Sequence, residues 1–238
     1  MNYIFDVDGT LTPSRGEMDS EFKDWFNKFQ DNNITFLVTG SDKFKTVEQI
    51  GKQTYNKFIR CYNCQGNEVW EGDVNKKKVN IVLPPQMIEV LETVLSNSVF
   101  PLRTGQHIES RSGLVNFSVL GRNANQDERQ GYIIFDKRIG ERAALARYLN
   151  KHFPEYHASV AGETGIDIIV KGQDKSQILS DFKPDDKITF FGDKTKEGGN
   201  DYEIAQAVKK HGGHVYNVAD WKNTYAILRG LQYMSFLL

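Results

Sequence analysis

The sequence predicts an α/β fold: a doubly wound parallel-sheet core with an inserted α+β domain that contains an antiparallel sheet. Short apolar runs alternate with helical patterns near both ends of the chain, whereas the middle carries a hairpin signal instead. A length of 238 residues suits one core fold with one inserted domain. Apolar residues make up 39% of the chain, enough to bury a substantial core.

The core is predicted from the two ends of the chain. Strand, helix, strand, helix, strand in sequence implies a parallel sheet with right-handed crossovers. The predicted strands are residues 3–7, 34–38, 58–62, 187–191 and 214–218, and helical spacing covers residues 22–29, 44–50 and 202–210. We therefore assign residues 1–81 and 172–238 to the core.

The inserted domain is predicted over residues 82–171. After Pro84 and Pro85 comes a helix to about residue 95, and a second helix covers residues 140–152. The remaining strand candidates are residues 107–111, 114–120, 157–161 and 165–171, the first two joined by Ser112-Gly113, which is typical of a hairpin turn. We call this α+β insertion the cap.

Charge and cysteine content exclude several classes of function. The chain has 30 Lys and Arg against 31 Asp and Glu, so it has no overall field for nucleic acid or an anionic membrane. No apolar run approaches the ~20 residues of a membrane span, and no signal peptide is evident, so we expect a cytoplasmic protein. Cys61 and Cys64 lack a second ligand pair for zinc and the context of a redox motif, so we predict reduced thiols.

Polar residues follow the predicted core strands where a parallel sheet binds ligands. Asp6 and Asp8 end the first strand, Thr39 and Ser41 follow the second, and Asp193 follows a late strand. Taken singly, each could be a helix cap or a turn residue. Together, three carboxylates at neighbouring strand ends would repel one another unless a cation lay between them, and hard oxygen ligands favour Mg²⁺.

The motifs resemble those of the haloacid dehalogenase (HAD) superfamily. The segment Asp6-Val7-Asp8-Gly9-Thr10 is similar to its first motif, and Gly192-Asp193 with Gly199-Asn200-Asp201 to its last. Lys175 stands where the insertion returns to the core, and the resemblance favours a role there over an ordinary surface lysine.

The resemblance implies a role for each of these residues. Asp6 is the nucleophile and Asp8 the general acid and base. Mg²⁺ is expected to bind Asp6, Asp193 and the backbone carbonyl of Asp8, with Asn200 and Asp201 in support. Lys175 offsets charge, and Thr39 or Ser41 contacts the phosphoryl group.

Within that superfamily, the chain most resembles the eukaryotic-type phosphomannomutases. The resemblance depends on residues 5–12 followed by Arg15, 111–116, 121–122, 128–129, 190–195 and 198–204. It implies that Arg15, Arg111, Arg122, Arg129 and Asp167 bind the sugar and the non-reacting phosphate. It also implies a hexose 1,6-bisphosphate activator, a homodimer formed through the cap, and a place in GDP-mannose biosynthesis.

The hairpin gives independent support for some of these assignments. A two-residue turn at Ser112-Gly113 places Arg111, Glu109 and Asn116 on one polar face, suited to a sugar phosphate. The alternative is that the arginines only solvate the surface. The chain also departs from the family: Gly165 replaces a serine that contacts the sugar, Thr39 replaces a glycine, and the acidic segment for a second cation is absent after residue 204.

Three functions follow as hypotheses. The first is a mutase that interconverts hexose 6-phosphate and hexose 1-phosphate, with mannose favoured, through an aspartyl-phosphate on Asp6. The second is a sugar-phosphate phosphatase on the same scaffold, which Thr39 favours slightly while the arginines favour the mutase. The third, a noncatalytic sugar-phosphate-binding protein, is disfavoured because both Asp6 and Asp8 are present.

Overall fold

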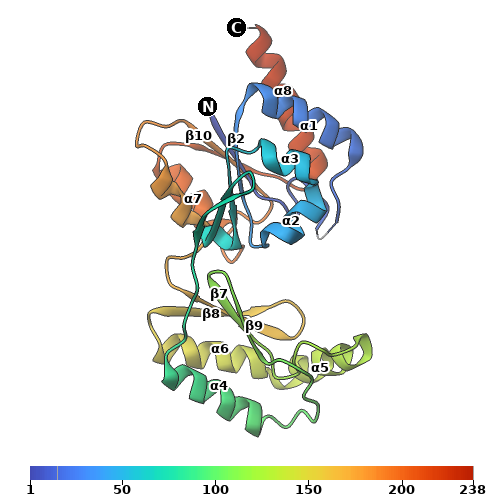
Figure 1. Ribbon diagram of the computed structural model, residues 1–238, viewed down its shortest axis with the longest axis vertical. Coiled ribbons are helices and arrows are strands. Elements are labelled where there is room, and N and C mark those ends of the chain that lie inside the picture. The colour runs from blue at the N-terminus through green and yellow to red at the C-terminus, as the bar shows by residue number, and fades with distance from the viewer. Residues whose placement is uncertain (15, 238) are drawn as a thin grey trace. The chain divides into compact units, whose positions relative to one another are not determined.

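The computed structural model describes residues 1–14 and 16–237, which form two compact units (Figure 1). The core unit comprises Met1–Lys78 and Gly172–Leu238, and the cap unit comprises Val79–Lys171. The cap unit thus begins at Val79 rather than at residue 82. The carbonyl of Val79 accepts the N–H of Gly113 at 2.7 Å, which ties this segment to the cap hairpin.

The core unit is built on a seven-stranded sheet of order β11-β10-β1-β2-β3-β4-β5. The first five strands in that order are parallel, and β4 and β5 add an antiparallel edge. Their bounds are β1 Asn2–Phe5, β2 Ile34–Val38, β3 Arg60–Asn63, β4 Glu68–Glu71, β5 Val74–Lys78, β10 Ile188–Gly192 and β11 His214–Asn217. The predicted parallel sheet is confirmed, whereas the β4–β5 edge was not predicted, because β5 is exposed along its whole length and shows no apolar alternation.

Helices cover both faces of this sheet, as a doubly wound fold requires (Figure 1). Phe5 and Phe191, from adjacent strands, stack at 5.0 Å between ring centroids and pack with α1 (Ser20–Asn32), α3 (Lys52–Lys57) and α8 (Trp221–Leu237). The preceding residues, Ile4 and Phe190, pack on the opposite face with η2 (Lys175–Asp181) and α7 (Tyr202–Lys210). The strands are therefore apolar on both sides.

The cap unit has a four-stranded antiparallel sheet of order β6-β7-β9-β8. Its strands are β6 Ile108–Arg111, β7 Leu114–Phe117, β8 Tyr156–Ala161 and β9 Gly165–Val170, and its helices are α4 Pro85–Asn97, α5 Gln126–Ile139 and α6 Glu141–His152. Val115 and Phe117 pack into the apolar core of this unit, on the face of the hairpin opposite to that of Asn116.

Helix α5 was missed from the sequence. It is largely polar and is started by a capping box, in which Asn125 and Glu128 satisfy each other's backbone N–H groups. Among residues 1–14 and 16–237, no helix is long and apolar enough to cross a membrane.

Candidate active site

Three strand ends meet at one edge of the core sheet. β1 lies between β10 and β2 and runs parallel to both. Asp6, Asp193 and Thr39, which follow these strands, therefore share the edge at which open parallel sheets bind ligands.

The backbone after β1 turns tightly at this edge. The carbonyl of Val7 accepts the backbone N–H groups of Thr10, Leu11 and Thr12, at 2.9–3.1 Å. Gly9 takes φ 79°, and a Cβ atom there would collide with the Asp193 carboxylate. Glycine thus lets the turn approach Asp193 closely.

A buried ionic cluster lies beneath this turn. The ammonium of Lys175 lies 2.6 Å from Asp6 Oδ1 and 2.6 Å from Asp201 Oδ1. The side chains of Lys175, Asp6 and Asp201 are 1%, 3% and 0% exposed, so the three charges depend on one another rather than on water. The sequence prediction placed Lys175 in the site, and the structure brings it into direct contact with Asp6.

The cluster has the donors expected of a divalent cation site. Carboxylate oxygens of Asp6, Asp193 and Asp201 lie within 4.8 Å of one another. Asp6 Oδ2 and Asp193 Oδ1 are buried, and neither has a hydrogen-bond partner among the described residues. Three carboxylates against one ammonium leave net negative charge, so the residues present fit a hard cation such as Mg²⁺.

The pKa values in the cluster reflect the same excess of negative charge. Burial and the neighbouring Asp201 raise the pKa of Asp6 to about 7, against the opposing effect of Lys175. The same two causes raise the pKa of Asp193. Burial would lower the pKa of Lys175, but Asp201 and Asp6 outweigh it and raise the pKa. A bound cation would lower the pKa of both aspartates.

Asp8 has a partner that was not predicted, and Asn200 lies outside the cluster. The carboxylate of Asp8 accepts a hydrogen bond from Gln49 Nε2 at 2.9 Å, whereas the predicted metal ligand of this residue is its backbone carbonyl. Asn200 is exposed, and of the two predicted supporting residues only Asp201 joins the buried cluster. Sequence reasoning missed Gln49, although a glutamine on the buried face of an amphipathic helix was an available signal.

The loop after β2 is held by its neighbour β3. Thr39 is buried, and its hydroxyl accepts the backbone N–H of Ser41 at 3.1 Å, which leaves the hydroxyl proton to be donated. The carbonyls of Thr39 and Ser41 accept N–H groups from Gln65 and Cys64, at 2.8 and 3.0 Å. Both predicted phosphoryl contacts therefore lie on a fixed loop at the strand end.

Cys64 and Gln65 belong to the short 3₁₀ turn η1 (Cys64–Gly66) and adopt positive φ, 48° and 61°. These values are strained for residues other than glycine, and the hydrogen bonds to the β2 loop hold them. Cys61 and Cys64 are both buried thiols, and no disulfide joins them.

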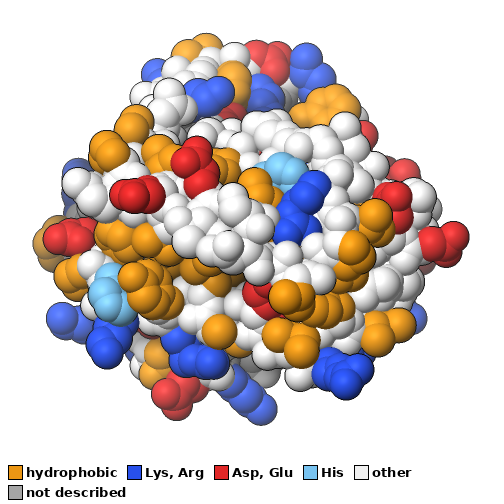
Figure 2. Space-filling model, turned by 90° about the horizontal axis from the view of Figure 1, so that it is seen from below, with side chains coloured by type: hydrophobic (Ala, Val, Ile, Leu, Met, Phe, Trp, Pro, Cys, Tyr) orange, Lys and Arg blue, Asp and Glu red, His pale blue; other side chains and the backbone are white. Residues whose placement is uncertain are grey.

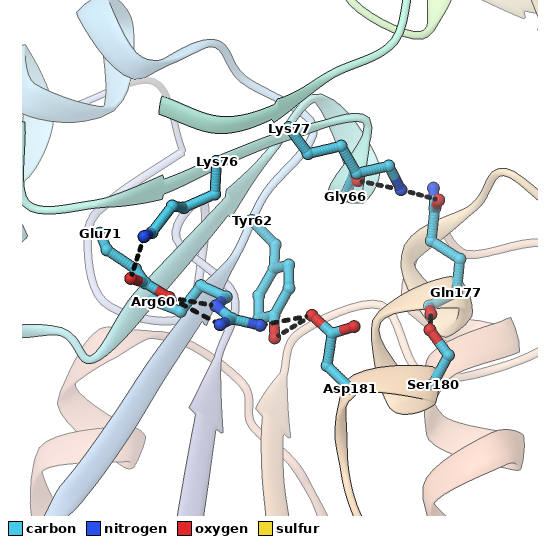
Figure 3. Close-up of polar contacts among 9 residues, drawn as sticks. All are labelled: Arg60, Tyr62, Gly66, Glu71, Lys76, Lys77, Gln177, Ser180 and Asp181. Carbon is cyan, nitrogen blue, oxygen red and sulfur yellow. Dashed lines mark hydrogen bonds and ion pairs between the residues drawn. The ribbon is translucent and has the colours of Figure 1, made fainter. Parts of the chain in front are cut away.

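Lys175 is presented by η2, and Figure 3 shows how this element is fastened to the sheet edge. Asp181 accepts from Arg60 at 2.7 Å and from Tyr62 at 3.0 Å (Figure 3). Gln177 accepts from Lys77 at 3.1 Å and donates to the carbonyl of Gln65 at 2.8 Å. These contacts fix the position of η2 against the sheet edge and so restrict the position of the Lys175 side chain.

The cap unit gathers a second group of predicted residues on one face of its sheet. The register pairs Glu109 with Asn116 and Asn116 with Asp167. Glu109 binds Arg111 at 2.7 Å and Arg122 at 2.9 Å, and the hydrogen bond from Arg111 is the main cause that lowers the pKa of Glu109. One carboxylate thus aligns two guanidinium groups, which is the polar face predicted from the hairpin.

Asn116 extends this network. Its amide donates to Asp167 at 2.7 Å and accepts from Arg122 at 3.3 Å. A Cβ atom at Gly165 would lie 2.7 Å from Asn116 Nδ2, so the serine of the related family would require this amide to move.

The two remaining predicted arginines are Arg129 and Arg15. Arg129 pairs with Glu163 at 3.0 Å. Arg15 lies outside the described residues.

The sequence of this chain matches those of known proteins. The family model described as eukaryotic phosphomannomutase matches residues 22–231. The chain belongs to the eukaryotic phosphomannomutase family. The phosphomannomutase of Galdieria sulphuraria is 33% identical over 228 residues, covering 91% of this chain and 90% of the relative. That of Arabidopsis thaliana is 32% identical over 225 residues, covering 91% and 92%.

Solved structures share the fold of this phosphomannomutase-family chain. A haloacid dehalogenase-like hydrolase from Bacteroides thetaiotaomicron superposes with a TM-score of 0.63 at 15% identity, covering 97% of this chain and 98% of that one. A sugar phosphatase of HAD subclass IIB superposes with a TM-score of 0.59 at 14% identity, covering the same shares. At these identities the likeness concerns the fold, and it confirms the HAD-like prediction.

Proposed function

We propose that this protein is a phosphotransferase that interconverts hexose 6-phosphate and hexose 1-phosphate, with mannose as the favoured hexose, through an aspartyl-phosphate on Asp6. Membership of the phosphomannomutase family supports this reaction. The observation that carries it is the state of Asp6: one oxygen is held by Lys175, and the other is buried without a hydrogen bond among the described residues. An oriented carboxylate with one uncommitted oxygen suits a nucleophile.

In the proposed step, a carboxylate oxygen of Asp6 attacks phosphorus and the bond from phosphorus to the sugar oxygen breaks. Asp8 donates a proton to that oxygen, and accepts one from the incoming hydroxyl when the phosphoryl group moves on. Lys175 and the hydroxyl of Thr39 stabilise the charge of the phosphoryl oxygens. The carboxylates of Asp6 and Asp193 and the carbonyl of Asp8 would hold Mg²⁺, which would supply further charge neutralisation.

We assign the sugar and its non-reacting phosphate to the cap unit. Guanidinium groups bind phosphate through paired hydrogen bonds, and Glu109 already aligns Arg111 and Arg122. Asp167 and Arg129, in the cap unit, and Arg15, which precedes that unit in the chain, complete the proposed set. A hexose 1,6-bisphosphate primes the enzyme by phosphorylating Asp6.

The phosphatase alternative would use the same residues. Thr39 is buried, and its hydroxyl keeps a proton that it can donate to a phosphoryl oxygen in either reaction. The two reactions differ only in whether a sugar hydroxyl or water accepts the phosphoryl group.

The test supplies purified protein with Mg²⁺ and mannose 1-phosphate, with and without catalytic glucose 1,6-bisphosphate. Mannose 6-phosphate and free phosphate are followed together. Isomerisation that depends on the bisphosphate, with little free phosphate, establishes the mutase. Steady phosphate release without isomerisation establishes the phosphatase and overturns the mutase proposal.

We also propose that the protein pairs as a homodimer through the cap unit. A groove of about 730 Å³ lies between α4, the end of α5 and α6, and its lining includes Val90, Val94, Ile139, Leu145 and Tyr148. Figure 2 views the molecule from the end where α4 and α6 lie in Figure 1 and shows hydrophobic side chains among charged ones. Ile139 and Tyr148 in this lining are 56% and 45% exposed, so the groove presents large apolar side chains to solvent.

Light scattering tests the dimer. Ile139→Asp should give monomers, whereas Ile134→Asp, at an exposed site outside the groove lining, should leave the mass unchanged. A dimer that survives Ile139→Asp would exclude this surface.

A further inference from the structure

Helix α2 (Lys43–Ile50) places one glutamine against the proposed acid–base residue. Gln49 is 4% exposed and lies on the inward face of the helix with Thr46 and Ile50. Its amide nitrogen donates to Asp8 Oδ1 at 2.9 Å and lies 3.4 Å from the carbonyl oxygen of Gly16. The side chain therefore joins α2 to both ends of the segment that follows β1.

The position of this amide is fixed from several directions. The backbone carbonyl of Gln49 accepts the N–H of Met18 at 2.7 Å, and the start of α2 is capped by Asp42, which accepts from Lys45 at 2.8 Å. Both neighbours of Nε2 are acceptors, so the amide takes the orientation that presents its N–H groups to them.

Burying the Gln49 side chain costs folding free energy, because one of its polar atoms has no hydrogen bond among the described residues. Gln49 Oε1 is buried and has no hydrogen-bond partner among the described residues. A leucine or methionine would fill the same space without burying an unsatisfied oxygen. The donor aimed at Asp8 is the feature that an apolar side chain could not reproduce.

We propose that Gln49 is a positioning residue that holds the Asp8 carboxylate in the orientation for proton transfer. This inference rests on the acid–base role proposed above for Asp8. Asp8 is half-buried at a strand end, and its carboxylate can rotate about two side-chain bonds. A hydrogen bond from a rigid helix selects one orientation, and misplacement of a reacting group by about 1 Å can cost ~10²-fold in rate.

The test depends on the leaving group. When a hexose phosphate phosphorylates Asp6, the departing sugar oxygen needs the proton of Asp8. When p-nitrophenyl phosphate does so, p-nitrophenolate leaves as a stable anion and needs no proton. A residue that acts only through Asp8 therefore affects the first reaction and not the burst of p-nitrophenol in the second.

The primary variant is Gln49→Met, which keeps the size of the side chain and removes the donor. We expect kcat with mannose 1-phosphate, Mg²⁺ and bisphosphate to fall about 10- to 100-fold, with KM changed less than about twofold, because a positioning group lost in the transition state lowers kcat. The rate of the p-nitrophenol burst should remain that of the unaltered protein. Gln49→Glu, which keeps burial and length but replaces the donor with an acceptor, should show the same selective loss.

Gln30→Leu is the matched control. Gln30 is also buried in the core unit and also has an unbonded Oε1, but its amide nitrogen lies by Thr35 and Thr54. It should leave both reactions unchanged. A double variant, Asp8→Ala with Gln49→Met, should be no slower than Asp8→Ala alone, because the two changes remove the same function.

The outcomes separate the inference from the proposed function. Equal losses in both reactions, or no loss with mannose 1-phosphate, would overturn the positioning role while leaving the mutase intact. Full additivity in the double variant would overturn it too. Absence of both reactions in the unaltered protein would refute the proposed function instead, and the inference with it.

Discussion

The buried cluster predicts how the stability of the metal-free protein depends on pH. Asp6 lies against Asp201 and is shielded from water, and its pKa is raised from 3.8 to about 7. The folded state therefore binds the Asp6 proton more tightly than the unfolded state does. Asp6→Asn keeps the shape of the side chain and removes the titration.

The size of the effect follows from the shift. A change from 3.8 to about 7 corresponds to about 4 kcal/mol, at about 1.36 kcal/mol per pH unit. Because the folded pKa is raised, the contribution is fully present below pH 4 and is lost as the pH rises through 7. Between pH 5 and 8 the unaltered protein should lose about 2.5 kcal/mol that Asp6→Asn keeps.

The measurement is urea unfolding in EDTA at pH 5, 6, 7 and 8 for both proteins. The free energy of unfolding should fall steeply with pH in the unaltered protein and much less in Asp6→Asn, where Asp193, whose pKa is also raised, leaves a smaller slope. Saturating Mg²⁺ should restore stability at pH 8 only where Asp6 is present, by ~2.7 kcal/mol at 100 times Kd. Parallel pH curves for the two proteins would refute this account of the cluster.

Three further substitutions test other parts of the site. Lys175→Met leaves two buried carboxylates without their ammonium and should destabilise the fold by about 3–5 kcal/mol at pH 8, less at pH 5, in the same unfolding assay; an unchanged midpoint would contradict the buried pairing. Gly9→Ala should weaken Mg²⁺ binding at least ~10-fold by calorimetry, because its Cβ meets Asp193, whereas Gly212→Ala, at similar φ but with no neighbour within 4 Å, should cost only stability. Arg111→Ala should raise KM for mannose 1-phosphate by ~10- to 100-fold. The control is Arg103→Ala: the Arg103 guanidinium binds backbone carbonyls at the end of α4, so this variant should lower the melting temperature and leave KM unchanged. Equal effects of the two variants on KM would contradict the assignment of Arg111 to substrate binding.

Elements with strong periodicity could be predicted from the sequence. The apolar runs at residues 34–38 and 187–191 became β2 and β10, and the aromatic spacing at residues 22–29 became α1. The β4–β5 edge and α5 could not be predicted. Strand β5 is exposed and contains three lysines, and α5 is a polar helix that is started by a capping box. Their patterns carry little apolar contrast, so tertiary contacts decide them.

The site divides in a similar way. Local motifs identified Asp6, Asp8 and Asp193 because a strand followed by a turn places these residues at one edge, whatever the rest of the chain does. The side chains that contact these aspartates could not be predicted from local motifs. Lys175 meets Asp6 across 169 residues of sequence, and Gln49 meets Asp8 across 41.

The sequence by itself determined the order of the strongly periodic elements, the strand-end carboxylates and the polar face of the cap hairpin, since each depends on neighbours a few residues away. Only the tertiary structure decided that Lys175 joins Asp6 to Asp201, that Gln49 holds Asp8, and that Glu109 aligns two arginines. These contacts depend on packing between elements distant in the chain. Side-chain identity alone does not specify these contacts, because lysine, glutamine and glutamate side chains are usually exposed to solvent.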